Sequence, residues 1–304
     1  MNKPKSVSIG KKISKLELSH LDKVFWPKKG YTKGDLVDYY RDISPVMLPY
    51  IKDRPHNLLR QPNGYKGKSF FQKDMGDLPP EWIKTASIYS ESNEKDIDYL
   101  VCDSADSLLY MVQLGCIEIN PWNSKVKSLH KPDWVVLDLD PEDVPFNQVV
   151  EVANIVRLVT EELGVAAYPK TSGKTGIHVY MPLAAQYDYE QAKKFGEILA
   201  NLVHRRTDNI TSLERNPGKR QKRIYLDFLQ NSQGQTLAAP YSVRPTDDAT
   251  VSTPLMWEEL NSRLKPTMFT IKNLRKRLDK VGDLWQPVIG KGIDIEKILK
   301  NLSE

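Results

Sequence analysis

The stretch Asp133-Trp-Val-Val-Leu-Asp-Leu-Asp-Pro141 decides the fold, because it reads as a buried strand that ends in two carboxylates. Side chains alternate between the faces of a strand, so Asp138 and Asp140 are expected on the same face. Two strand rises separate them by roughly 6.5 Å, close enough to share divalent cations. The alternative is a solvated strand end whose aspartates form a turn before Pro141. For an isolated Asp-x-Asp sequence, that alternative is the better interpretation.

The whole chain has the composition of an ordinary folded protein. Its 304 residues are 40% hydrophobic and 27% charged, enough for one large domain or two medium ones. No stretch resembles a signal peptide or a membrane span, so we expect a cytosolic protein without a membrane partner. Only Cys102 and Cys116 are present, which argues against structural zinc and disulfides and favours two small buried side chains.

Positive charge is concentrated near the N-terminus. Residues 1–80 hold 16 Lys and Arg against 8 Asp and Glu, whereas the rest of the chain holds 28 against 31. Nucleic acid is the commonest polyanionic partner of such a surface, and a merely solvated lysine-rich surface is the alternative. Between residues 54 and 73, cations alternate with aromatic rings, the combination that grips single strands and DNA ends. These residues are Arg54, Arg60, Tyr65, Lys66, Lys68, Phe70, Phe71 and Lys73.

The adjacent rings of Phe70 and Phe71 allow two interpretations. In a strand, one ring would face the core and the other could face a ligand. The alternative places both in the core.

The sequence also predicts elements on either side of this stretch. Upstream, the pattern predicts a helix from Thr32 or Lys33 to Ile43, which Thr32 would cap and two later prolines would end or kink. Downstream, it predicts a helix followed by a strand within residues 103–120.

From residue 134 the pattern becomes regular and predicts an α+β unit. Its elements are a strand at 134–139, a helix at 146–163, strands at 165–170 and 177–181, a helix at 189–205 and a strand at 224–228. This order is the split βαβ or ferredoxin-like arrangement of RNA-recognition modules. We expect the first strand in the centre, between the third and the fourth.

That topology would bring a third carboxylate to the first two. Asp227, in the fourth strand, would lie beside Asp138 and Asp140, and His178 would approach from the third strand. Three carboxylates on one sheet face are a plausible two-metal site, in which cations stabilise the attacking and leaving oxygens of an in-line phosphoryl displacement.

The loop Ser172-Gly-Lys-Thr-Gly-Ile-His178 contains the tail of a P-loop. However, the earlier glycine of that motif would fall at Tyr168, and a strand follows instead of a helix, so the P-loop interpretation fails. With donors from Ser172, Lys174 and His178, the loop can still cradle a triphosphate. A plain glycine hairpin is the alternative.

Basic and amide residues surround the fourth strand. The run Lys219-Arg-Gln-Lys-Arg223, directly before that strand, suggests an electropositive rim of the site. Gln230, Asn231 and Arg244 could reach substrate phosphates or sugar. Arg244 is best suited, because its planar guanidinium matches phosphate oxygens. Near the C-terminus, a basic helix is expected at 271–280. We interpret its cations, Lys272, Arg275, Lys276 and Arg277, as solvated.

These segments together resemble the polymerase domain of bacterial ligase D, a branch of the archaeo-eukaryotic primase superfamily that works in non-homologous end joining. The matching segments, in family order from about residue 15 to 290, are Asp22-Lys-Val-Phe-Trp-Pro27, Thr32-Lys-Gly-Asp35, Arg54-Pro55, Ser69-Phe-Phe-Gln-Lys73, Asp133 to Pro141, Thr171 to Val179, Tyr225-Leu-Asp-Phe-Leu-Gln-Asn231, Ala238-Ala-Pro-Tyr-Ser-Val-Arg-Pro245 and Val251-Ser-Thr-Pro-Leu255. Their joint order and spacing make the resemblance specific.

The resemblance implies a primase-polymerase fold with an RNA-recognition-like catalytic sheet and an N-terminal α/β module. The implied modules are a flexible basic leader at 1–15, a DNA-end-binding module at 16–130, a catalytic module at 131–250 and a C-terminal helical extension at 251–304, packed into one polymerase domain. The implied activity is template-directed addition of nucleotides, preferentially ribonucleotides, at DNA gaps and ends with Mn²⁺ or Mg²⁺. The implied partners are 5′-phosphorylated DNA, nucleoside triphosphates, Ku and a DNA ligase, in the bacterial cytosol.

The resemblance also assigns roles to single residues. Asp138, Asp140 and Asp227 match the metal-binding aspartates. Ser172, Lys174 and His178 match the incoming-nucleotide loop, and Arg220 and Arg244 match basic residues of the polymerase site. Gln230 is expected to contact the nucleotide from its position soon after Asp227. Lys23 and Lys33 match the lysines that hold the 5′-phosphate of a break, and Arg54, Phe70, Phe71 and Lys73 are expected near the template strand.

The sequence departs from the family pattern at Asn120, in Ile117-Glu-Ile-Asn-Pro-Trp122, where many members have His. An amide neither protonates nor binds metal like imidazole, so that residue's role is not carried over. Two other functions stay open on the sequence: a primase that starts synthesis without a primer, and a non-catalytic module that grips 5′-phosphorylated DNA.

Overall fold

Strand β8, Trp134–Pro141, is the centre of a five-stranded sheet with the order β11-β12-β8-β10-β9. Both neighbours, β10 (Ile177–Pro182) and β12 (Ile224–Asp227), run antiparallel to it. Beyond them lie β9 (Tyr168–Thr171) and the short parallel β11 (Thr211–Ser212). The predicted central position of the first strand, between the third and the fourth, is confirmed.

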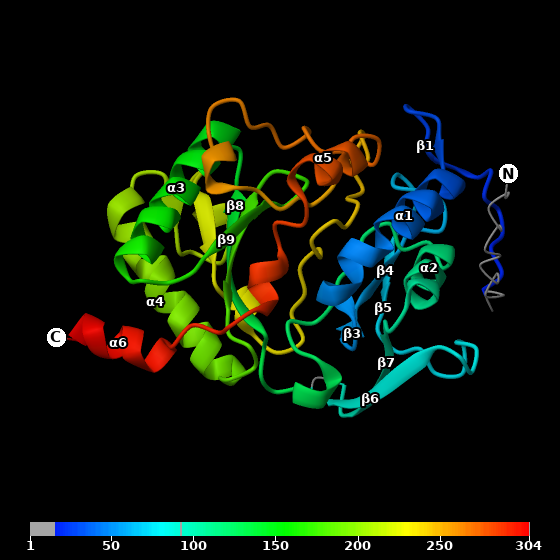
Figure 1. The fold of residues 1–304 in the computed structure, drawn as a ribbon, viewed down its shortest axis with the longest axis horizontal. Helices are drawn as coiled ribbons and strands as arrows, with labels where there is room; N and C mark the ends of the chain where they lie inside the picture. Colours follow the sequence, from blue (N-terminus) through cyan, green and yellow to red (C-terminus); the bar gives the residue numbers. More distant parts are fainter. Residues whose placement is uncertain (1–15, 92, 304) are drawn as a thin grey trace, which may run out of the picture.

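Two helices, α3 (Phe146–Glu162) and α4 (Tyr189–Thr207), cover one face of this sheet (Figure 1). Asp188 begins α4 with a capping box, which satisfies otherwise unpaired backbone N–H groups of the first turn. The alternate β8 residues Val135 and Leu137 are fully buried against these helices. The helical face therefore forms one of the two large hydrophobic cores.

The other face of the sheet packs against the N-terminal half of the chain. Trp134, Val136 and Tyr180 belong to the core built around α1 and α2. Because Asp138 and Asp140 share their strand face with Trp134 and Val136, both point toward the N-terminal half. The computed structural model describes residues 16–91 and 93–303, so the leader predicted at 1–15 lies outside the described residues.

The N-terminal half combines two helices with three small sheets. The helices are α1 (Lys33–Ile51) and α2 (Ala105–Gln113). The strands are β1 (Val24–Trp26) with β2 (Tyr31–Thr32), β4 (Leu58–Arg60) with β5 (Phe70–Gln72), and the sheet of β3 (Pro55–His56), β7 (Lys95–Val101) and β6 (Lys84–Ser90). In Figure 1 this half lies opposite α3 and α4, across the central sheet.

Helix α1 continues eight residues beyond its predicted end and passes through Pro45 and Pro49. Pro45 has no N–H to donate to the carbonyl of Arg41, but the Ser44 hydroxyl donates to that oxygen at 3.0 Å. The last turns also bury Met47 completely. The gain from this burial outweighs the cost of the prolines, so the prediction that they end the helix was wrong.

The strand predicted after α2 is also absent from the described residues. Residues 116–122 make only isolated bridges, among them Cys116 with Arg60 and Trp122 with Thr236. Their apolar side chains are buried, which explains the strand-like pattern. Both cysteines are buried and free, as predicted.

The C-terminal segment contacts both halves. The backbone N–H of Thr171 in β9 donates to the carbonyl of Thr253 at 2.9 Å. Helix α5 (Leu274–Val281) lies near α1. Just before α5, Lys272 forms an ion pair of 2.9 Å with Asp35 of α1. Helix α6 (Ile295–Ser303) lies at the end of the chain.

Short 3₁₀ helices occupy Val126–Ser128, Pro217–Lys219, Leu229–Asn231, Trp257–Glu259 and Gln286–Ile289. One cation near α5 differs from expectation. Arg277 is largely buried and binds Glu259 at 2.6 Å, so its predicted solvation was wrong.

In the described part of the chain, each helix is too short or too polar to cross a membrane.

Candidate active site

A row of four side chains crosses the central sheet. Lys170 in β9 is the register partner of His178 in β10, His178 of Asp138 in β8, and Asp138 of Asp227 in β12. Directly opposed residues in antiparallel strands present their side chains on the same face. Asp140 lies two residues further along β8, opposite Tyr225. The sheet thus brings the three predicted aspartates together on one face. These three side chains form the carboxylate edge of the site.

Like charges make this edge electrostatically unfavourable on its own. Asp138 is 13% exposed, and burial, Asp227 and Asp140 together raise its pKa to about 8. Partial burial also raises the pKa of Asp140, against the opposing effect of Arg220. Oxygen-only ligands at an anionic, partly buried edge are the donor set that Mg²⁺ and Mn²⁺ prefer.

Two of the three carboxylates, Asp140 and Asp227, have other partners. Arg220 lies 3.3 Å from Asp140 and stacks over the ring of Tyr225 at 4.1 Å. Both oxygens of Asp227 accept hydrogen bonds of 2.9 Å, one from the backbone N–H of Leu229 and one from the Gln230 amide. Among residues 16–91 and 93–303, no cluster of three such side chains is close enough to form a complete metal site as it stands. A bound cation would therefore compete with Arg220 for Asp140.

The loop between β9 and β10 folds around Ser172. Its hydroxyl accepts from the backbone N–H groups of Lys174 at 3.1 Å and Gly176 at 2.9 Å. Burial and Arg244 lower the pKa of the Lys174 ammonium, which makes no ion pair within the described residues. This ammonium is free to meet an anion.

The two glycines of this loop serve packing against the protein itself. Gly173 has φ +78°, and a side chain there would meet the backbone of Ser252 at 2.8 Å. A side chain on Gly176 would lie 2.4 Å from the carbonyl oxygen of Leu139. Both glycines are therefore required by the loop's closeness to its neighbours, before any ligand is considered.

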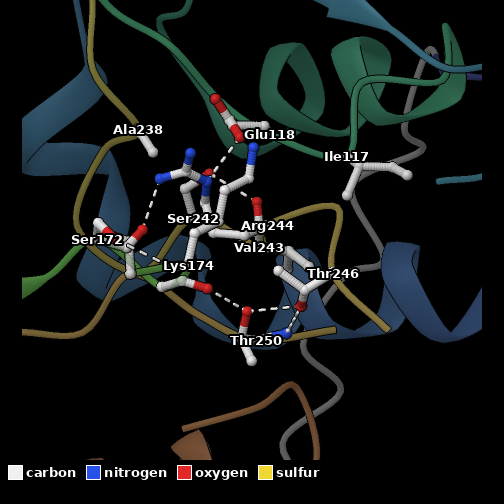
Figure 2. A network of polar contacts seen from close by, with 12 residues as sticks. Ile117, Glu118, Ser172, Lys174, Ala238, Ser242, Val243, Arg244, Thr246 and Thr250 are labelled. Atoms are coloured by element: carbon white, nitrogen blue, oxygen red, sulfur yellow. Dashed lines mark hydrogen bonds and ion pairs between the residues drawn. The ribbon is translucent and has the colours of Figure 1, made fainter. Parts of the chain in front are cut away.

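Arg244 joins the loop to the segment before Asn120. Its Nε donates to Glu118 at 2.6 Å, and its Nη1 donates to the carbonyl of Ser172 at 2.6 Å (Figure 2). Figure 2 shows Lys174 beside this pair. Asn120 is buried two residues after Glu118, and its carbonyl accepts from the backbone N–H of Asn57 at 3.1 Å.

Sequence reasoning missed Lys170, which is completely buried beside His178. A signal was available, because Lys170 and His178 are equally distant from Lys174 at the centre of the hairpin. A symmetric hairpin makes such residues cross-strand partners. Glu118, the partner of Arg244, was also missed, since 126 residues separate the pair.

A basic pocket of about 270 Å³ lies at the start of α1. Among the described residues, its lining includes Lys23, Lys33, His20 and Arg60 and no Asp or Glu. Lys33 is buried, with its ammonium 2.8 Å from Gln113, and burial followed by the charge of Lys23 lowers its pKa. Such a pocket favours an anion.

The residues expected near a template do not share one environment. Phe70 and Phe71 are 44% and 67% exposed, so neither ring lies in the core, and both interpretations that placed a ring there were wrong. Lys73 is exposed next to them. Arg54 is completely buried, forms an ion pair with Asp133 and stacks over Trp134 at 4.1 Å, which leaves it no surface for DNA. Its predicted DNA contact is therefore wrong.

Asn231 likewise has an internal role. Its side-chain amide donates to the carbonyl of Val136 at 2.7 Å and accepts from the N–H of the same residue at 2.8 Å. The Asn231 amide thus makes strand-like hydrogen bonds to the backbone of β8 beyond the end of β12. Its suggested contact with substrate is wrong, because the residue is buried.

The arrangement agrees with comparisons to known proteins. The family model of the LigD primase-polymerase domain matches residues 32–285. This chain belongs to that family. Its predicted primase-polymerase fold is confirmed by a solved structure, the polymerase domain from Mycobacterium tuberculosis ligase D in complex with DNA, with a TM-score of 0.83 and 29% identity over 92% of this chain and 100% of that one.

Curated relatives of this LigD-family chain are longer. The bifunctional non-homologous end joining protein LigD of Bacillus subtilis is 33% identical over 88% of this chain, but only 43% of that protein is covered. The multifunctional LigD proteins of Mycolicibacterium smegmatis and Pseudomonas aeruginosa are 31% and 30% identical over 91% and 90% of the chain, covering 36% and 33% of those proteins. The chain spans about two fifths of their length or less.

Proposed function

We propose that this LigD-family chain is a template-directed nucleotidyltransferase that adds nucleotides at DNA gaps and double-strand-break ends. The observation that carries the proposal is the in-register pair of Asp138 and Asp227, with Asp140 at the same edge and the loop of Ser172 and Lys174 beside it. A carboxylate edge next to a basic loop suits a metal-bound nucleoside triphosphate. Catalysis is also the use that best explains three carboxylates in one place.

The chain's own residues would bind and orient the substrates. Lys174 and Arg244 would hold the triphosphate, where fixed cations stabilise charge that develops on the phosphates. His178 and Ser172 would contribute nucleotide contacts from the same loop and strand. Gln230 binds Asp227 and lines a pocket of about 280 Å³ with Arg220, which would leave both able to contact the nucleotide when the aspartates turn toward cations.

Asp138, Asp140 and Asp227 would hold Mn²⁺ or Mg²⁺. When bound, such cations lower the pKa of an attacking 3′-hydroxyl and neutralise the leaving pyrophosphate. Their charge would also remove the repulsion that now raises the pKa of Asp138. The pairing of Asp140 with Arg220 gives the site a form in which a guanidinium partly compensates the carboxylates.

The basic pocket would bind the 5′-phosphate on the downstream side of a gap. In the part of the chain that the structure describes, Lys23 and Lys33 line it without a competing carboxylate, and both ammonium groups bind neutral oxygens that a phosphate can replace. The exposed rings of Phe70 and Phe71, with Lys73, would stack on and follow the template strand.

The finer parts of the proposal follow from the family resemblance. They are a preference for ribonucleotides, action in the bacterial cytosol on nucleoid DNA, and cooperation with Ku and a DNA ligase. The modules at 16–130, 131–250 and 251–304 are part of the same proposal. The relatives are named as non-homologous end joining proteins, which supports the DNA-break context.

Extension on a gapped duplex tests the proposal. The DNA carries a 5′-phosphate, and ribo- and deoxynucleotides are compared with Mg²⁺ and with Mn²⁺. Wild-type protein is expected to fill the gap, and Asp138→Ala or Asp227→Ala protein to give no product with either metal. Undiminished extension by either variant would overturn the catalytic assignment.

Two other functions predict different results. A primase of the same superfamily would synthesise on single-stranded template and nucleotides without a primer. A non-catalytic end-binding module would keep tight, salt-sensitive DNA binding and show no extension under any condition. Incubation without primer and binding assays on the aspartate variants separate these functions from gap filling.

A further inference from the structure

The side-chain nitrogen of Lys170 is completely buried and has three hydrogen-bond partners. Its Nζ lies 2.6 Å from the Ser252 hydroxyl, 2.9 Å from Nδ1 of His178 and 3.0 Å from the carbonyl oxygen of Ala238. Burial and the charge of Arg244 lower the pKa of Lys170, whereas Asp138 and Glu118 act in the opposite direction. In its protonated form the lysine has three N–H donors and no acceptor, so the three contacts match its donors one for one. Ser252 donates its own hydrogen to the carbonyl of Thr171, which leaves a lone pair for Lys170.

With Lys170 protonated, this arrangement sets which ring nitrogen of His178 carries the hydrogen. Since Nδ1 accepts from Lys170, the neutral imidazole has its hydrogen on Nε2, which lies 3.4 Å from Oδ1 of Asp138. The other tautomer would place a hydrogen between Nδ1 and a donor-only ammonium.

We propose that Lys170 is a positioning residue that holds His178 in the tautomer with hydrogen on Nε2, so that this N–H faces Asp138 and the proposed nucleotide site. The effect on catalysis rests on the proposed function, whereas the tautomer does not. The four partners in register across β9, β10, β8 and β12 make one chain of interactions from a buried cation to the carboxylates.

A space-filling role alone does not explain a lysine at this position. Burying an ammonium costs free energy that its partners only partly return, and an apolar side chain would fill the same space without that desolvation cost. The position is fully enclosed, and its methylene stem could be matched by methionine. The use of lysine is explained by what its N–H groups do, and His178 is the partner closest to the site.

Nitrogen-15 NMR of histidine side chains tests the tautomer directly. The chain has five histidines, and His178→Gln protein identifies the resonance pair of His178. Wild-type protein is expected to show a protonated Nε2 and an unprotonated, hydrogen-bonded Nδ1 at His178. In Lys170→Met protein this preference should be lost, whereas Lys170→Gln, whose amide can still donate, should retain it. A wild-type ring protonated on Nδ1, or an unchanged tautomer in Lys170→Met, would overturn the proposal.

A matched control and a stability measurement exclude a merely structural effect. Ser252→Ala removes another partner of the same ammonium and is expected to leave the His178 tautomer unchanged. Lys170→Met leaves the Ala238 carbonyl and the Ser252 hydroxyl without their buried donor, so it should unfold at a lower temperature than wild type, and the tautomer is compared at a temperature where all variants are folded. If Lys170→Met does not fold, the comparison of Lys170→Gln with wild type decides, because loss of the Nε2-protonated tautomer in that folded variant would contradict the hydrogen-bond mechanism.

A double-variant cycle tests the link to turnover. Lys170→Met is expected to lower kcat for gap filling by about 10–100-fold, the usual effect of losing a partner that orients a site residue. If Lys170 acts through His178, the Lys170→Met/His178→Gln protein should be no slower than His178→Gln alone. Fully multiplicative losses would overturn the proposed route. If wild-type protein fills no gap, the proposed function fails while the NMR result still judges the tautomer.

Discussion

Asp227 and Asp138 are direct cross-strand partners in β12 and β8, with both carboxylates on the sheet face that looks toward the N-terminal half. Like charges directly opposite one another destabilise a sheet. The repulsion contributes to the raised pKa of Asp138, after burial and together with Asp140. The fold therefore keeps an unfavourable electrostatic arrangement at the place where the proposed cations bind.

The first prediction concerns stability without metal. A carboxyl group whose pKa rises from 3.8 to about 8 on folding binds its proton more tightly in the folded protein, so its contribution to the free energy of unfolding falls as the pH rises through that range. Relative to Asp138→Asn, wild-type protein should lose up to about 4 kcal/mol between pH 5 and pH 8. Urea unfolding in a chelator measures this difference.

Comparison at each pH is needed because buried His56, with a pKa lowered to about 4, acts in the opposite direction below pH 6.5. The control is Asp143→Asn, since that exposed carboxylate pairs with Lys222 at the surface and should not reproduce the change. An Asp138→Asn protein with the wild-type pH slope would contradict the prediction.

The second prediction concerns Arg220, which competes with cations for Asp140. Removing a partly exposed ion pair at 3.3 Å is worth about 0.5–1 kcal/mol, so Arg220→Ala should bind Mn²⁺ about two- to fivefold more tightly. Isothermal titration calorimetry provides the measurement. Lys222→Ala, which removes an exposed cation from the same basic run, should leave the affinity unchanged. Weaker Mn²⁺ binding by Arg220→Ala would instead show that the guanidinium supports the site.

Much of the site was predictable because it depends on strand alternation and on topology. The two-residue period put Asp138 and Asp140 on one face, and the ferredoxin-like order put Asp227 beside them. The position of Asp140 against Arg220 was not predictable, since it depends on how a loop 80 residues away folds back. Arg54 was misjudged for the same reason, because its burial depends on Asp133, which lies 79 residues later.

The third prediction concerns the basic pocket at the start of α1. Lys23→Ala and Lys33→Ala should each reduce the preference for 5′-phosphorylated over 5′-hydroxyl DNA by about tenfold, roughly 1.4 kcal/mol. Each should also lower the dependence of binding on salt. Fluorescence anisotropy with the two DNA forms measures both effects. Lys52→Ala, at the opposite end of α1, is the control and should keep the full preference. Equal losses of affinity for both DNA forms would contradict the prediction, because they would show that the lysines contact DNA without binding its 5′-phosphate.

The fourth prediction concerns Gly176, whose closeness to β8 sets the position of the proposed triphosphate loop. In Gly176→Ala the added Cβ would lie 2.4 Å from the carbonyl oxygen of Leu139, so the loop must move away from the strand that carries Asp138. We expect a loss of about 1–3 kcal/mol in the free energy of unfolding and at least tenfold weaker nucleotide binding. Gly218→Ala is the matched control, because its new Cβ would meet nothing closer than 3.6 Å. Urea unfolding and nucleotide titration measure the two effects. Unchanged nucleotide affinity in a destabilised Gly176→Ala protein would show that the loop does not hold the triphosphate.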